Sequence, residues 1–169
     1  MDYRTLKSGT DVRGLAVGEG AVVTPAVCEN LAAAFVRMLS ESEGKPAEAI
    51  RVAVGRDSRV TGEALLRAVI SGIRKAGACA LDFGLSTTPA MYMSILEPDV
   101  APDGAVMVTA SHHPWDKNGL KFFERSGGFT DARVTELLEG ARDVDASALP
   151  VSGAEEKLDF LSLYQERLA

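Results

Sequence analysis

Segments whose apolar residues recur every three or four positions alternate along the chain with short, continuous apolar runs. The recurring pattern is typical of helices that bury one face. Threonine is a good N-cap residue and proline fits the first helical turn, and this pair opens two of the segments. We therefore predict four helices capped by threonine and a fifth with an apolar stripe, with the caps at Thr24, Thr61, Thr88 and Thr130 and the stripe from Leu158 to Leu168.

The short apolar runs predict buried strands over residues 51–54, 79–83, 105–109 and 119–123. Strands that alternate with helices indicate an α/β layer fold with parallel strands. The last two strands are expected to be antiparallel, because the nine-residue loop between them is short for a crossover. We predict a three-layer α/β/α sandwich with a mixed, mainly parallel sheet of about four strands. Residues 1–24 predict irregular chain or a short hairpin at 8–14.

Composition narrows the class of protein. The chain has 169 residues, 46% hydrophobic and 25% charged, which is typical of one soluble globular domain. Its net charge of −6 argues against a nucleic-acid partner. It has no apolar run long enough to span a membrane and no signal-peptide pattern, so we expect no membrane partner and a cytoplasmic location. Cys28 and Cys79 fit no metal or redox spacing and are expected to be buried, inert thiols.

Ligands of α/β sheets usually bind at the loops that follow the carboxyl ends of the strands. The loop over residues 110–118 is the most unusual of these, since it holds a serine, two histidines, a lysine and an amide. Ser111 is either a nucleophile in an electropositive loop that cradles phosphate, or a serine that caps a turn. Residue types alone favour neither, and Lys121 on the next strand is placed to point back at the loop. A metal pair of His112 and His113 is disfavoured, because no third histidine exists.

Two further segments have both a structural and a chemical interpretation. The loop Gly55-Arg56-Asp57-Ser58-Arg59 precedes a helix N-terminus and is either a charged helix start or an anion-handling loop. Spacing alone favours the structural interpretation. The structural interpretation is also favoured for Arg13 in the segment 10–14, since an isolated Asp and Arg near the start of a chain are more often a surface pair than a site.

Four motifs together resemble a known family. The segment Thr109-Ala110-Ser111-His112-His113-Pro114, with 118–122 after it, resembles the phosphoserine loop of the alpha-D-phosphohexomutases. Residues 8–14 resemble the opening motif of that family, residues 55–59 its Gly-Arg-Asp-x-Arg motif, and Thr88-Pro89 its following Thr-Pro. The motifs occur in the family's order and span residues 8 to 122.

The resemblance implies a role for each matching residue. Ser111 would carry a phosphoryl group, give it to a hexose phosphate and recover one from the bisphosphorylated sugar intermediate. Lys121 would assist proton transfer at the sugar hydroxyl, and His112 would hydrogen-bond or act as acid or base beside the phosphoserine. Arg13 would lie near the bound phosphosugar, and substrate binding would further involve Thr10, Arg56 and Lys121. Such transfer depends mainly on positioning and on neutralising spread negative charge.

The resemblance also implies partners. Family members bind Mg²⁺ between the phosphoserine and an Asp-Gly-Asp-type loop in a second domain, so Ser111 would ligate the metal through its phosphate. Residues 1–169 contain no such loop. We therefore expect residues 1–150 to be the phosphoserine domain and 151–169 to be a connector and helix that lead toward a second domain of the same polypeptide. His113 stands where the family commonly has Asn, which leaves its ligand contact open.

These observations predict a phosphohexomutase domain that acts on mannose or glucose phosphates through the 1,6-bisphosphate, active only with the remaining domains. A phosphoglucosamine mutase domain and a non-catalytic phosphate-binding module are the alternatives. A serine hydrolase is disfavoured, because the Gly-x-Ser-x-Gly pattern is absent and His112 is poorly placed as a base for the adjacent serine. The hypothesis requires the Ser111 hydroxyl to be accessible and close to Arg13 and Lys121.

Overall fold

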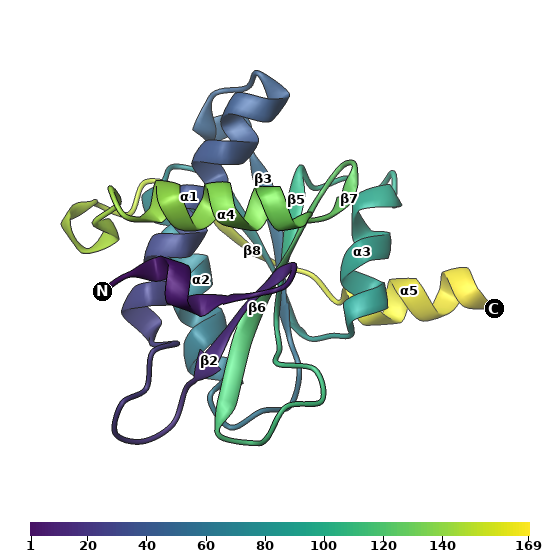
Figure 1. Cartoon of the computed structure of the whole chain (residues 1–169). Coiled ribbons are helices and arrows are strands. Elements are labelled where there is room, and N and C mark those ends of the chain that lie inside the picture. The colour runs from purple at the N-terminus through teal and green to yellow at the C-terminus, as the bar shows by residue number, and fades with distance from the viewer.

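A mixed sheet with helices on both faces forms the architecture in the computed structural model, which describes residues 1–169 (Figure 1). The helices are α1 (Pro25–Glu43), α2 (Gly62–Lys75), α3 (Thr88–Leu96), α4 (Asp131–Ala141) and α5 (Phe160–Leu168). The strands are β1 (Lys7–Ser8), β2 (Asp11–Leu15), β3 (Arg51–Arg56), β4 (Cys79–Leu85), β5 (Gly104–Val108), β6 (Lys117–Glu124), β7 (Gly127–Gly128) and β8 (Glu155–Lys157). Single 3-10 turns occupy Tyr3–Leu6, Ala47–Ala49 and Ala146–Ala148.

The strand order is β1-β2-β6-β5-β3-β4-β8, with β7 paired to β6. Strand β3 is parallel to β4 and β5, and β4 is parallel to β8. All other pairs are antiparallel, including the predicted β5–β6 pair and the hairpin of β1 and β2. The predicted three-layer fold with a mixed sheet is confirmed. The predicted number of about four strands is wrong, since there are eight, and parallel pairs do not outnumber antiparallel ones.

Two of the four predicted helix caps are confirmed. The Thr24 hydroxyl accepts a hydrogen bond from the Val27 amide, and the Thr130 hydroxyl accepts one from Arg133, both at 3.3 Å. The cap of α3 is one residue earlier than predicted, at Thr87. Thr61 occupies the N-cap position of α2, but its hydroxyl makes no capping bond and accepts instead from the Asn118 side chain at 2.9 Å. This bond joins the start of α2 to β6.

The two faces of the sheet are covered unequally. A cluster of 35 buried residues fills the space between the sheet and α1, α2 and α4, with Phe35 packed on Phe122 at 5.0 Å between ring centroids. On the other face, α3 and α5 cover a cluster of 11 residues, in which Phe83 stacks on Phe160 at 4.8 Å (Figure 1). Burial of this apolar surface is the main source of stability.

The segment after residue 150 contributes to the same sheet. Strand β8 pairs with β4, and α5, which was predicted as the final helix, packs against β4 and α3. The division of the chain at residue 150 stays a prediction. No helix has the length and apolar character that a bilayer crossing requires.

The cysteines differ in their surroundings. Cys28 is fully buried in α1, and burial raises the pKa of its thiol to about 12. Cys79 is partly buried at the start of β4, and burial also raises its pKa. Because the thiolate is the reactive form, the environment keeps Cys28 inert.

Candidate functional site

The carboxyl ends of β3, β4 and β5 bring three loops together. The amide of Asp57, just after β3, donates to the Val108 carbonyl at the end of β5, and the Ser86 amide donates to the Arg56 carbonyl at 2.9 Å. Gly55 permits this approach, because a Cβ there would lie 2.6 Å from the sulfur of Met91 and 2.8 Å from Cβ of Ser86. The loops that follow β3, β4 and β5 are therefore connected through the backbone.

Ser111 lies on the loop that follows β5 and is exposed. Its φ of 55° is left-handed, a conformation that costs a non-glycine residue roughly 1 to 3 kcal/mol. The loop is held by a chain of hydrogen bonds. The Ser111 amide donates to the Thr109 hydroxyl at 2.9 Å, and that hydroxyl donates to Asp57 Oδ2 at 2.6 Å. The serine side chain is exposed at the surface while its backbone is fixed.

A buried carboxylate organises the cations beside Ser111. Asp11, 4% exposed, accepts from Arg13 Nη2 at 2.5 Å and from Lys121 Nζ at 2.6 Å. The same Arg13 nitrogen lies 3.3 Å from Ser111 Oγ. Lys121 is therefore linked to the serine through Asp11 and Arg13. We call Asp11, Arg13 and Lys121 the charge trio.

The sheet register explains how the charge trio forms. Arg13 of β2 is opposite Gly119 of β6. A Cβ at Gly119 would meet the Val12 carbonyl oxygen well inside van der Waals contact and lie 2.9 Å from Cγ of Arg13. Asp11 and Arg13 are two residues apart on one strand and therefore share a face. The prediction of a surface pair for this Asp and Arg is wrong, because Asp11 is buried and Arg13 nearly so.

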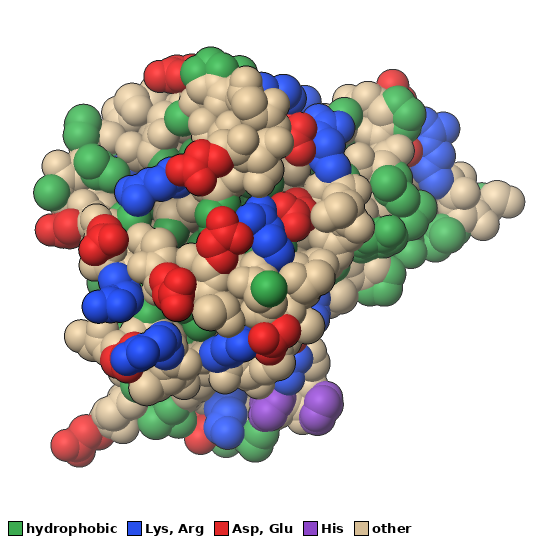
Figure 2. All heavy atoms as spheres, turned by 45° about the horizontal axis from the view of Figure 1, so that its top comes forward, with side chains coloured by type: hydrophobic (Ala, Val, Ile, Leu, Met, Phe, Trp, Pro, Cys, Tyr) green, Lys and Arg blue, Asp and Glu red, His purple; other side chains and the backbone are tan.

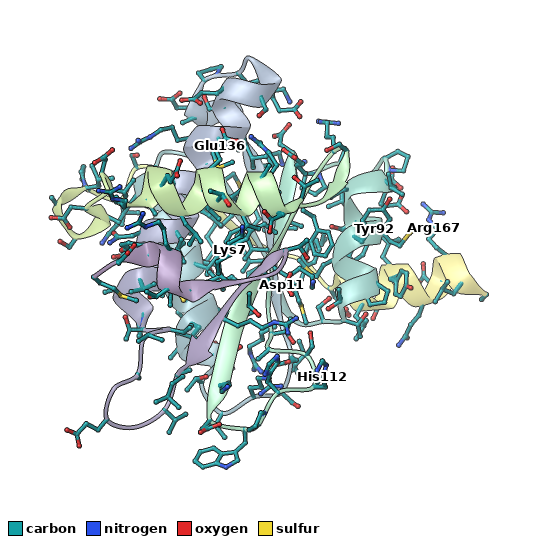
Figure 3. All side chains as sticks on the ribbon, in the orientation of Figure 1. Lys7, Asp11, Tyr92, His112, Glu136 and Arg167 are labelled. Atoms are coloured by element: carbon teal, nitrogen blue, oxygen red, sulfur yellow. The ribbon has the colours of Figure 1, made fainter.

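The histidines lie beside these cations. Their rings stack at 5.1 Å between centroids, and both are visible at the surface next to basic side chains (Figure 2). The pKa of His113 is lowered, first by desolvation and then by the positive charges of Arg13, His112, Lys117 and Arg59. Figure 3 shows Asp11 at the start of β2 and His112 on the loop below it. The loop is therefore electropositive within an acidic chain, as binding of an anion requires.

Two predicted substrate-binding residues are not brought to Ser111 by a contact. The Arg56 guanidinium bonds Glu63 at 2.9 Å and the Asp57 carbonyl at 3.1 Å. Thr10 lies exposed in the turn between β1 and β2. Their roles stay predictions. The arginine of this motif that does reach the loop is Arg59, which sequence reasoning did not single out.

The residues of this chain do not form a metal site by themselves. No group of three or more His, Cys, Asp or Glu side chains is placed to hold an ion. Asp11 is already shared by two cations, so it is not a free ligand. An ion at Ser111 would depend on a phosphate there and on ligands from outside these residues.

Fold and site together define an α/β domain with an exposed serine beside cationic side chains at the carboxyl edge of its sheet. Residues 4–146 match the family model described as phosphoglucomutase/phosphomannomutase, alpha/beta/alpha domain I. The chain belongs to this family of mutases, which are isomerases, and represents its domain I.

Sequence relatives share this domain. A phosphoglucosamine mutase of Pediococcus pentosaceus is 36% identical over 84% of this chain and 30% of its own length. One from Thermobifida fusca is 39% identical over 78% of this chain and 28% of its own. The chain thus spans about a third or less of these curated relatives.

Solved structures have the same fold. A phosphoglucomutase/phosphomannomutase family protein of Burkholderia thailandensis superposes with a TM-score of 0.81 and 27% identity, over 99% of this chain and 36% of that one. A putative phosphomannomutase of Thermus thermophilus gives a TM-score of 0.76 and 26% identity, over 96% of this chain and 35% of that one.

Proposed function

We propose that Ser111 is the phosphorylated residue of a phosphohexomutase and that this domain exchanges a phosphoryl group with a hexose phosphate. One observation carries the proposal: the Ser111 hydroxyl is exposed and lies 3.3 Å from Arg13, within an electropositive loop. A surface serine that only caps a turn does not need a buried carboxylate that fixes two cations beside it. The non-catalytic phosphate-binding module is less favoured, because the family consists of mutases.

The proposed transfer step is a direct displacement at phosphorus. An oxygen of a sugar hydroxyl attacks the phosphorus on Ser111, the bond from phosphorus to Oγ breaks, and the hydroxyl proton ends on Oγ. The products are a sugar bisphosphate and free serine. In the return step Oγ attacks the other phosphorus, the bond from that phosphorus to the sugar oxygen breaks, and the Oγ proton ends on this oxygen. The products are the isomeric monophosphate and phosphorylated Ser111. In this proposal Arg13 stabilises the negative charge on the transferring group, and Lys121, which is linked to Arg13 through Asp11, exchanges the proton.

Magnesium, when bound through the Ser111 phosphate, would neutralise charge on that phosphate. Its other ligands would come from the Asp-rich loop of another domain, because this chain offers no such group. The 169-residue chain alone is therefore expected to give no turnover, and measurable turnover by it would contradict this part of the proposal.

The sugar is proposed to be a glucosamine phosphate. Relatives 36–39% identical are phosphoglucosamine mutases, whereas the solved structures with phosphomannomutase or phosphoglucomutase in their names are 26–27% identical. Glucose and mannose phosphates are the second candidates because of these structural neighbours.

The test begins with the intact mass of the complete gene product. After incubation with glucosamine 1,6-bisphosphate or glucose 1,6-bisphosphate we expect a gain of about 80 Da that maps to Ser111. Ser111→Ala should abolish the gain, and Ser126→Ala, which removes another exposed serine, should keep it. Initial rates with glucosamine, glucose and mannose 1-phosphates then rank the substrates. A phosphoryl group that persists in Ser111→Ala would refute the proposal.

A further inference from the structure

Arg59 lies in the loop between β3 and α2, and its side chain reaches the backbone of the loop that carries Ser111. Its Nη2 donates to the carbonyls of Ser111 and His113 at 2.7 and 2.9 Å. Its Nη1 donates to the carbonyls of Pro114 and Lys117 at 2.7 and 3.0 Å. One side chain thus joins both ends of the segment from residue 111 to residue 117.

The remaining donor of Arg59 completes the arrangement. Its Nε lies 3.3 Å from Asp57 Oδ2, the oxygen that also accepts from the Thr109 hydroxyl. A guanidinium has five N–H donors in a fixed plane, and the structure supplies five acceptors. The Arg59 side chain is 12% exposed. It therefore has no free donor for a phosphate, unlike Arg13, which reaches Ser111 Oγ.

We propose that Arg59 is the positioning residue of the phosphoserine loop: it holds Ser111 in its left-handed conformation and aims its hydroxyl at Arg13, without touching the phosphate. The peptide on each side of Ser111 is fixed through one network, the amide through Thr109 and the carbonyl through Arg59. This inference rests on the proposed function of Ser111. It gives Arg59 a role different from both interpretations of the 55–59 loop in the sequence, a charged helix start and an anion-handling loop.

Two substitutions separate positioning from charge. Arg59→Lys keeps the positive charge, but an ammonium has three donors on one atom and cannot reach four carbonyls. Arg59→Met removes charge and donors and keeps much of the volume. If Arg59 positions the loop, the rate of Ser111 phosphorylation falls in both variants. If it acts on the phosphate by charge, Arg59→Lys keeps most of the activity.

The assay uses the complete gene product and glucose 1,6-bisphosphate as the phosphoryl donor. We expect the rate of Ser111 phosphorylation to fall roughly 10- to 100-fold in both variants, as expected when a reacting group is misplaced by about an ångström. The affinity for the donor should stay within about threefold, because no contact with it is lost. Amide hydrogen exchange in residues 110–117 should accelerate about tenfold or more, while α1 and α2 stay protected.

Arg74→Met is the matched control. Arg74 also donates to a backbone carbonyl, that of Gly153 at 3.1 Å, but at the opposite end of α2. It should leave transfer and loop exchange unchanged. The proposal is overturned if Arg59→Lys transfers at the wild-type rate, if affinity falls in step with rate, or if loop exchange is unaltered. Failure of the wild-type protein to phosphorylate Ser111 would refute the proposed function instead, and the exchange measurement would still decide the role of Arg59.

Discussion

Replacing Asp11 by Asn tests whether the charge trio is built as described. Asparagine has nearly the same shape but no charge, and only one of its two terminal atoms accepts hydrogen bonds. Either Arg13 or Lys121 would therefore lose its partner, although both lie at hydrogen-bonding distance from Asp11 in the native protein. The substitution leaves a cation without compensation in a mostly buried place.

The expected loss follows from burial. Removal of one partner of a buried ion pair costs roughly 3 to 5 kcal/mol. Since the side chains of Arg13 and Lys121 are 17% and 23% exposed, water solvates the orphaned cation in part, and we expect about 2 to 3 kcal/mol. For a domain of this size that corresponds to a fall in Tm of roughly 4 to 12 °C.

Thermal unfolding followed by circular dichroism near neutral pH measures this loss. Asp131→Asn is the control, because its pair with Lys7 involves a carboxylate that is 71% exposed, and we expect its Tm to fall by only about 2 °C or less. Inorganic phosphate should stabilise Asp11→Asn more than the wild type, since the variant has one more net positive charge beside Ser111. Equal Tm values for the two variants would refute the argument that Asp11 organises the site.

Four further predictions follow from single residues. Gly119→Ala should destabilise the protein by about 3 kcal/mol, because its Cβ would collide with the Val12 carbonyl. Gly140→Ala in open space on α4 should stabilise it by roughly 0.5 to 1 kcal/mol, and urea denaturation compares the two. The imidazole of His113 should titrate below its ordinary pKa of 6.5, as followed by NMR. The unfolded state then binds a proton more readily than the folded state, so neutral His113 stabilises the fold above pH 6.5, and this stability is lost as the pH falls toward the lowered pKa. His113→Gln should weaken this pH dependence, and a titration midpoint at the ordinary value would contradict the prediction. Iodoacetamide should label Cys28 only on unfolding, as read by mass spectrometry, and rapid labelling of the native protein would disprove its burial.

Much of the fold follows from local pattern. The stripe in α1 and the pair Thr24-Pro25 predict that helix well, because a cap and an amphipathic face are encoded in neighbouring residues. Strands β7 and β8 were not predicted, and the hairpin of β1 and β2 was expected only as an alternative to irregular chain. Strands of two or three residues show no alternation and pair only because other strands lie beside them. The error at Thr61 has the same origin, as its hydroxyl bonds a side chain on β6, 57 residues away.

The site was predictable as a set of loops but not as a set of contacts. The motif around Ser111 and the position of Lys121 after it indicated where chemistry lies. Arg56 and Arg59 are both arginines of one short loop, and the sequence does not show which turns toward Glu63 and which toward the serine loop. Asp11 was interpreted as part of a surface pair because its second partner, Lys121, reaches it only through the register of β2 and β6.

The unequal covering of the two sheet faces has a consequence for motion. The layer of α3 and α5 buries 11 residues against the sheet and the opposite layer buries 35, so the thinner layer should open at a lower free energy. The Ser111 loop is joined by hydrogen bonds to Arg13 of β2 and to Asp57 and Arg59, which follow β3, and it makes no hydrogen bond to α3 or α5. The helices of the thin layer can therefore detach and return while the serine keeps its geometry.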